Sequence, residues 1–344
     1  MCDLKQEIYF GTYTKKLSEG IYHATLDSVT NSISHPKNII SIGNPTYLRS
    51  LNNNMLLSIA TNKNQGGIAL YSSYNNQFTL LDSSLSEGSS PCYLGYDSQR
   101  NLVFAAYYHR GTVEAYHIDK NGHLTLTDSI KQSGAGPREE QKSSHIHYAD
   151  LTPDNRLAVI DLGSDTLTTY DISNEGKLTF KNQLKLPAGF GPRHLVFAPN
   201  NNYAYLIGEL SSQIATLKYH KSEGRFEIIS SISTIPSTFN KHNGASAIRI
   251  TSNGKYLYAA NRGHDSIVSY QILNDHTLDL IEYTNTQGSF PRDFALDSTE
   301  KFLIVANQNT NNISLFTVNQ QNGKLNCIQH DIVLPEGVCV CFKN

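Results

Sequence analysis

One strand-like segment recurs along the whole chain, and this repeat constrains the fold more than any other feature. Residues 256–261 and 302–307 are both apolar, both end in Ala-Asn, and both are followed by a polar turn and another strand-like segment. Their offset is 46 residues. Related segments make seven copies: 7–11, 55–60, 102–106, 157–161, 203–208, 256–261 and 302–307. A regular repeat of this length predicts one architecture of similar units rather than a series of unrelated domains.

Each repeat unit is expected to form a four-stranded antiparallel sheet. A shorter strand precedes each copy, and an alternating third strand and a fourth strand behind a Gly or Asn turn follow it, as in residues 116–126. The starts of the preceding strands are marked by Pro45, Pro91, His145, Pro192, Ala245, Pro291 and Glu336. Seven such sheets predict an all-β, seven-bladed β-propeller. The chain has no tryptophan, so it lacks the Trp-Asp signature of the commonest propellers.

The phase of the repeat predicts how the ring closes. The chain begins on a second strand, residues 8–10, and ends on a first strand, residues 338–342. The first blade must therefore combine both ends of the chain. We expect residues 1–344 to form a single domain that is closed by the C-terminal strand joining the N-terminal blade.

Composition excludes several classes of partner. The chain has 28 basic and 30 acidic residues and no run of like charge, so neither nucleic acid nor a membrane surface is an expected partner. No stretch of 18 apolar residues occurs, and residues 1–7 lack the pattern of a secretory signal. The five cysteines show no CxxC spacing, which favours reduced thiols and a cytoplasmic protein with no bound metal or other cofactor.

Up-and-down connectivity predicts where a functional site lies. If each first strand runs away from one face, the second strand returns to it, so the start of strand one and the turn after strand two are neighbours. The starts of first strands carry His145, His147, Arg193 and Arg292. The ends of second strands carry Lys63, Tyr108, Leu162, Glu209, Arg262 and Gln308. These side chains are expected to line one mouth of the propeller.

The histidine pair has two chemical interpretations. His145 and His147 stand two apart on a strand and should point the same way. Such a pair can ligate a metal, but no third ligand is evident from the sequence, so a hydrogen-bonding or general-base imidazole is favoured. His194 directly follows Arg193 and is expected to point to the opposite side, where it would pack. Cys92 also starts a first strand, with no activating base evident from the sequence.

The charged candidates likewise leave alternatives open. Arg193 and Arg292 each follow a proline, and a fixed guanidinium suits a carboxylate or phosphate ligand. Each could instead pair with a neighbouring acid such as Glu209 or Asp293. Glu209 could titrate in catalysis or anchor Arg262. No Gly-x-Ser-x-Gly elbow and no nucleotide-binding glycine motif occurs, so serine-triad and nucleotide chemistry are poorly supported.

Several separated motifs resemble the propeller-type lactonase family, which includes bacterial 6-phosphogluconolactonases and fungal carboxy-cis,cis-muconate lactonizing enzymes. The motifs are residues 145–147, 191–194, 209–212, 261–267 and 290–294, with further similarity at 9–13 and 334–337. The resemblance covers essentially the whole chain. It implies that the site of the family, a His, two Arg and a Glu, falls on His147, Arg193, Glu209 and Arg262.

The resemblance also implies a function. The expected reaction is hydrolysis of 6-phosphogluconolactone in the pentose phosphate pathway, by a carboxylic ester hydrolase that is a monomer or weak homodimer. Its partner would be a phosphorylated sugar lactone, bound with the help of His145, Arg292 and Gln308. Alternatives are a lactonase or cycloisomerase for another lactone or muconate, and a non-catalytic propeller that binds a protein or glycan.

Overall fold

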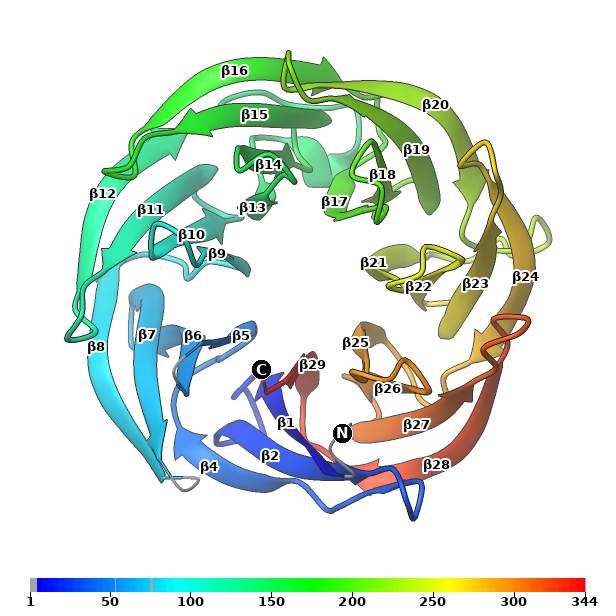
Figure 1. Cartoon of the computed structure of the whole chain (residues 1–344). Helices are drawn as coiled ribbons and strands as arrows, with labels where there is room; N and C mark the ends of the chain where they lie inside the picture. Colours follow the sequence, from blue (N-terminus) through cyan, green and yellow to red (C-terminus); the bar gives the residue numbers. More distant parts are fainter. Residues whose placement is uncertain (1–4, 53, 75–76, 344) are drawn as a thin grey trace. The chain divides into compact units, whose positions relative to one another are not determined.

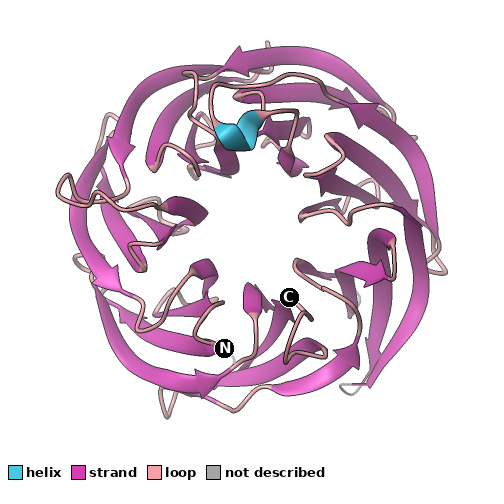
Figure 2. Ribbon diagram, turned by 180° about the vertical axis from the view of Figure 1, so that it is seen from behind, coloured by secondary structure: helices cyan, strands magenta, loops and turns pink. Residues whose placement is uncertain are grey.

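The structure of the protein, a computed structural model, describes residues 5–52, 54–74 and 77–343. These residues form strands almost throughout, and Figure 2 shows a single short helical turn, η1 (Glu139–Gln141). Contacts divide the chain into two compact units, residues 51–232 and residues 1–50 with 233–344. In the described part of the chain, no helix is long and apolar enough to cross a membrane.

The unit of residues 51–232 contains four antiparallel sheets of four strands, drawn side by side within each sheet in Figure 1. The first is β5 (Leu48–Leu51), β6 (Met55–Asn62), β7 (Gln65–Tyr74) and β8 (Gln77–Glu87), and the unit boundary falls within β5. The second is β9 (Tyr93–Asp97), β10 (Leu102–Tyr107), β11 (Thr112–Ile118) and β12 (Leu124–Lys131). The third is β13 (Ile146–Leu151), β14 (Leu157–Asp161), β15 (Thr166–Ile172) and β16 (Leu178–Lys185). The fourth is β17 (Pro192–Phe197), β18 (Tyr203–Gly208), β19 (Gln213–His220) and β20 (Arg225–Ser233).

The other unit contains three sheets. Two are regular: β21 (Gly244–Ile250), β22 (Tyr256–Arg262), β23 (Ser266–Ile272) and β24 (Leu278–Asn285), then β25 (Pro291–Leu296), β26 (Phe302–Asn307), β27 (Asn312–Val318) and β28 (Leu325–Val333). The third joins β29 (Gly337–Phe342) to β1 (Lys5–Thr12), β2 (Gly20–Asp27), β3 (Ser32–Ile33) and β4 (Lys37–Ser41). Its fourth strand is split into β3 and β4, with Pro36 between them. Proline has no backbone N–H to give to a strand ladder, which fits an interruption there.

The ends of the chain meet as the repeat phase predicts. β29 pairs antiparallel with β1, with Ile8 opposite Phe342 and Phe10 opposite Val340. The predicted closure by the C-terminal strand is therefore confirmed. The seven predicted second strands are also confirmed, as β1, β6, β10, β14, β18, β22 and β26. The predicted starts of the first strands lie within three residues of the observed ones, the largest difference being at β5, which begins at Leu48 rather than at Pro45.

Burial explains why the second strands read as nearly continuous apolar runs. Every residue of β10, β22 and β26 is buried, so these strands show no alternation of apolar and polar residues. Tyr258, Phe294 and Phe316, for example, share one apolar cluster drawn from two sheets. Fourth strands such as β12 alternate between partly buried and exposed residues, as expected for a strand with one solvated face.

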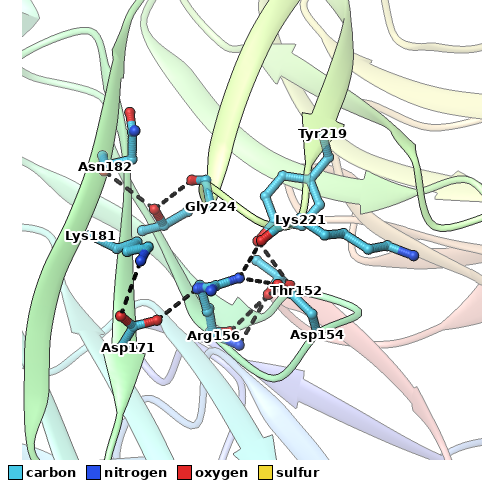
Figure 3. A network of polar contacts seen from close by, with 10 residues as sticks. Thr152, Asp154, Arg156, Asp171, Lys181, Asn182, Tyr219, Lys221 and Gly224 are labelled. Atoms are coloured by element: carbon cyan, nitrogen blue, oxygen red, sulfur yellow. Dashed lines mark hydrogen bonds and ion pairs between the residues drawn. The ribbon is translucent and has the colours of Figure 1, made fainter.

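A polar network ties the third sheet of the 51–232 unit to the fourth (Figure 3). Arg156 donates from Nε to Asp171 at 2.7 Å and from Nη1 to the Lys221 oxygen at 2.7 Å, and it is ion-paired with Asp154. The Tyr219 hydroxyl donates to the same Asp154 carboxylate at 2.8 Å. Asp154 lies in the turn beyond the end of β13, so this network fixes the end of that strand opposite His147.

Candidate active site

Three of the predicted site residues occupy the same structural position, a β-bulge at the start of a first strand. In β13, Ile146 pairs with Asp161 and Tyr148 with Ile160, so the register shifts at His147. The same register shift occurs at Arg193 in β17 and at Arg292 in β25. Bulges re-aim a side chain and are common beside active sites. The repeat therefore presents His147, Arg193 and Arg292 in the same way.

Glu209 brings two of these side chains together. It follows directly after β18, and its Oε2 is 2.9 Å from Arg193 Nε and 4.0 Å from His147 Nε2. Arg193 is 3% exposed and His147 is 4% exposed, so both groups are shielded from water. The predicted alternative of an Arg193–Glu209 ion pair is what the structure has. A buried guanidinium beside this carboxylate favours its charged form.

The two predicted histidines contact one aromatic ring. His145 stacks on Tyr108 with ring centroids 4.3 Å apart and planes at 8°, and its Nδ1 is 2.9 Å from the Tyr108 carbonyl oxygen. His147 meets the same ring edge-on at 5.6 Å. Asp161 accepts a hydrogen bond from the His145 backbone N–H at 2.7 Å, which fixes the chain just before β13. Burial, and then the charge of His145, lower the pKa of the nearby His109 imidazole.

His194 does not point away from the site, and that expectation is wrong. Its ring meets His147 at 5.2 Å and Tyr93 at 5.1 Å, and Arg193 Nη1 is 3.4 Å from both of its ring nitrogens. The bulge at Arg193 breaks the two-residue alternation on which the expectation depended. His194 is 5% exposed and packs against the candidate site itself.

The sequence also gave no reason to expect a base beside Cys92. In the structure Cys92 Sγ is 3.8 Å from His147 Nδ1. Cys92 directly precedes β9, and His147 is the second residue of β13. These first strands belong to different sheets, so their contact could not be predicted from the sequence of either strand.

Arg262 lies in the unit of residues 1–50 with 233–344, as the last residue of β22. Its guanidinium donates to the carbonyl oxygens of Gly244 at 3.1 Å and Ala245 at 3.3 Å, and it lies 5.3 Å from the Phe290 ring centroid. It is 6% exposed. The end of a second strand is thus held to the start of the adjacent first strand, as the connectivity predicts.

Arg292 in the same unit is not neutralised by Asp293. The Asp293 carboxylate accepts from Arg249 Nη2 at 2.8 Å and from the Val340 N–H at 3.0 Å, so the predicted alternative of an Arg292–Asp293 pair is wrong. Asp293 is thus held by groups from two other strands rather than by its neighbour in the sequence. Arg292 lies 5.6 Å from the centroid of the Tyr13 ring, and Lys15 Nζ lies 4.2 Å from the same centroid. Among the described residues neither cation has an ion-pair partner.

Gln308 directly follows β26, as expected. Its N–H donates to the Phe290 oxygen at 3.1 Å, and within the described residues its buried Oε1 has no hydrogen-bond partner. The other second-strand ends also fall where the sequence placed them. Lys63, Tyr108 and Leu162 directly follow β6, β10 and β14.

Asp165, which no sequence motif singled out, fixes the segment before Arg193. Its carboxylate accepts from the N–H groups of Gly189 at 2.8 Å and Gly191 at 2.7 Å, and from Gln141 Nε2 at 2.7 Å. Gly189 and Gly191 have φ of 82° and 59°, a conformation that favours glycine. The Gly-Phe-Gly spacing was a visible signal for this turn, but its carboxylate partner lies on another sheet.

In the described residues no group of three or more His, Cys, Asp or Glu side chains is arranged to hold a metal ion.

Comparison with known proteins places the chain in a family. Residues 7–342 match the model of the family described as lactonase, 7-bladed beta-propeller. The chain belongs to this lactonase family. The 6-phosphogluconolactonase of Bacillus subtilis is 39% identical to the lactonase over 341 residues, which is 97% of each chain. A solved structure from Lactobacillus plantarum matches with a TM-score of 0.98 at 46% identity, over 99% of the lactonase and 100% of that chain.

A more distant solved structure widens the comparison. The periplasmic gluconolactonase of Pseudomonas aeruginosa matches the lactonase with a TM-score of 0.92 at 25% identity, over 99% of each chain. The fold class is accordingly an all-β seven-bladed propeller, and the protein is a lactone hydrolase, a carboxylic ester hydrolase.

Proposed function

We propose that this lactonase hydrolyses 6-phosphoglucono-δ-lactone to 6-phosphogluconate, the lactone-opening step of the pentose phosphate pathway. The observation that carries the proposal is the buried cluster in which Arg193 and His147 both approach Glu209. Lactone hydrolysis needs an activated water, stabilisation of the developing oxyanion and a proton for the leaving ring oxygen. The name of the Bacillus subtilis relative supports the choice of substrate.

The proposed roles follow from the contacts. His147 takes a proton from the attacking water, and Arg193 stabilises the oxyanion that forms on the carbonyl. Glu209 orients both groups, and its ion pair with Arg193 makes it an acceptor rather than the acid. The imidazolium of His147 then returns the proton to the ring oxygen. Arg262 is kept as a second cation of the site because the family motif includes it.

The phosphate is proposed to bind through Arg292. Arg292 and Lys15 both contact the Tyr13 ring, and among the described residues neither has an acidic partner, so both charges are available to an anion. A phosphate dianion is the natural ligand of such cations. His145 and Gln308 are proposed to contact the sugar. We further propose a single-domain cytoplasmic enzyme that is a monomer or weak homodimer, although the Pseudomonas aeruginosa relative is named as periplasmic.

The first test is hydrolysis of freshly generated 6-phosphoglucono-δ-lactone, corrected for spontaneous ring opening. His147→Ala and Arg193→Ala should each lower kcat by roughly a hundredfold or more, because each removes a group that acts in the transition state. His123→Ala is the matched control, because it also removes an imidazole but His123 is exposed, with its Nδ1 3.7 Å from Asp82. Melting temperatures measured in parallel separate loss of chemistry from loss of fold.

Other outcomes identify the rival functions. Faster hydrolysis of glucono-δ-lactone than of its 6-phosphate ester would move the proposal to an unphosphorylated lactone. Turnover of a muconate or muconolactone would make the enzyme a cycloisomerase. A wild type with no activity on any of these substrates would favour a non-catalytic binding propeller, and full activity in His147→Ala would remove the imidazole from the role of base.

A further inference from the structure

The thiol of Cys92 is held against the imidazole of His147 within the unit of residues 51–232. Its Sγ is 3.8 Å from His147 Nδ1, and it is 3.5 Å and 3.7 Å from the carbonyl oxygens of Ile146 and His147. The Cys92 N–H donates to the Ala106 oxygen at 2.8 Å, directly before Tyr93 pairs with Ala106. The backbones of two first strands therefore fix the sulfur beside a nitrogen base.

The opposite nitrogen of the same imidazole faces a carboxylate. Glu209 Oε2 is 4.0 Å from His147 Nε2, so negative charge lies where it stabilises the imidazolium that forms when Nδ1 accepts a proton. Cys92 is only partly buried, whereas His147 is 4% exposed. A thiol, an imidazole and a carboxylate thus stand in sequence, and the thiol residue is partly exposed.

We propose that Cys92 is a reactive thiol, at which small soft electrophiles form a covalent adduct with His147 as the proton acceptor. We also propose that this adduct stops lactone hydrolysis, a consequence that rests on the proposed function. With iodoacetamide, the S–H proton passes to Nδ1, an S–C bond forms, the C–I bond breaks and iodide leaves. The added group lies against the imidazole and removes the proposed base from its working position.

The other described cysteines provide internal controls. Burial raises the pKa of the Cys341 thiol to about 11, raises that of Cys339 well above its usual value, and also raises that of Cys327. Like the Cys92 sulfur, their sulfurs contact backbone groups, such as the Leu48 N–H for Cys339 and the Gln329 oxygen for Cys327, but within the described residues none of the three has a hydrogen-bond contact with an imidazole. A thiol must ionise before it attacks an electrophile, so these three residues are expected to react slowly.

The experiment is timed alkylation of the folded full chain with iodoacetamide, read by peptide mapping beside lactone hydrolysis. Cys92 should react at least about tenfold faster than Cys327, because His147 Nδ1 lies 3.8 Å from its sulfur as a proton acceptor, whereas burial raises the pKa of the Cys327 thiol. Hydrolysis should fall in step with labelling of Cys92. Cys92→Ser should hydrolyse lactone like the wild type and resist the reagent, whereas Cys327→Ser, the matched control, should stay sensitive.

The role of His147 is tested without turnover. His147→Gln should slow labelling of Cys92 toward the rate of Cys327, and Glu209→Gln gives the same test if His147→Gln does not fold. Equal rates for Cys92 and Cys327, or a Cys92 rate that both variants leave unchanged, would overturn the reactive thiol. Full lactone hydrolysis after complete labelling of Cys92 would overturn the proposal that the adduct stops hydrolysis. If the wild type has no lactonase activity, both the proposed function and its inhibition by the adduct are wrong. The labelling rates still test the reactivity of the thiol in that case.

Discussion

At the scale of single residues, burial decides which ion pairs matter. Arg193 Nε and Glu209 Oε2 are 2.9 Å apart, and so are Arg225 Nε and Glu223 Oε2. The first pair is nearly excluded from water, with side-chain exposures of 4% and 19%, whereas the second has 38% and 56%. Water screens the second pair, and exposed pairs contribute little to stability. The same distance therefore implies different coupling energies.

A double-mutant cycle measures this difference. Glu209→Gln and Arg193→Met, singly and together, should show a coupling of about 1 to 3 kcal/mol in the free energy of unfolding, because each single change breaks an ion pair that is largely shielded from water. The matched cycle of Glu223→Gln and Arg225→Met should give less than about 1 kcal/mol. Urea unfolding gives both values. Equal coupling in the two cycles would contradict the argument from burial.

At the scale of elements, a carboxylate holds the loop between β1 and β2. Glu336, directly before β29, accepts from the backbone N–H groups of residues 15 to 18 at 2.9 to 3.2 Å. Burial works against its charge, but the hydrogen bonds from Leu17, Lys16, Ser18 and Lys15 outweigh burial and hold the pKa of Glu336 below its usual value. The loop that positions Tyr13 and Lys15 thus depends on an ionised side chain at the other end of the chain.

Glu336→Gln should lower the free energy of unfolding by about 1 to 3 kcal/mol at neutral pH, since it replaces a charged acceptor of several hydrogen bonds. A carboxyl group whose pKa is lowered by folding stabilises the folded state fully at pH values above its unfolded pKa of about 4.3. This stabilisation is lost as the pH falls through the pKa of the folded state. The wild type and the variant should therefore converge in acid. Urea unfolding at neutral pH and near pH 3 measures the difference in unfolding free energy between wild type and variant at each pH, with the exposed Glu139→Gln as control. A difference that is the same at both pH values would contradict this role.

At the scale of the whole molecule, the fold depends on one pairing between the ends of the chain. β29 is the first strand of a sheet whose other strands come from the N-terminal 41 residues. Val340 and Leu334 pack with Ile8 and Phe10 in the apolar cluster of that sheet. Without β29, both the ladder edge of β1 and this cluster would be opened to water.

A chain that ends at Leu334 should therefore fail to fold cooperatively. It loses the pairing from Ile8 with Phe342 to Thr12 with Gly337, and its unfolding transition should broaden or disappear. Differential scanning calorimetry tests this, with a chain that ends at Lys343 as control. A soluble protein that ends at Leu334 and keeps the wild-type melting temperature would contradict closure by β29.

The sequence alone determined the repeat, the strands and the ends of strands that carry the candidate residues. Alternation and apolar runs are local consequences of strand geometry, so β10, β22 and β26 could be recognised without knowledge of their neighbours. The second-strand ends at Glu209, Arg262 and Gln308 follow from the same periodicity. The expected lactonase function came from the resemblance of separate motifs to a known family, because the periodicity of the strands carries no information about chemistry.

Only the tertiary structure decided which side chains meet. The bulges at Arg193 and Arg292 shift the register by one residue. His194 lies beside His147, and Asp293 pairs with Arg249 rather than with Arg292. The contact of Cys92 with His147 joins strands on two sheets, 55 residues apart. A strand pattern gives the order of residues along one element, whereas bulges and contacts between sheets depend on packing against other elements. The strands were therefore predictable from the sequence, and the pairing of charges and bases was not.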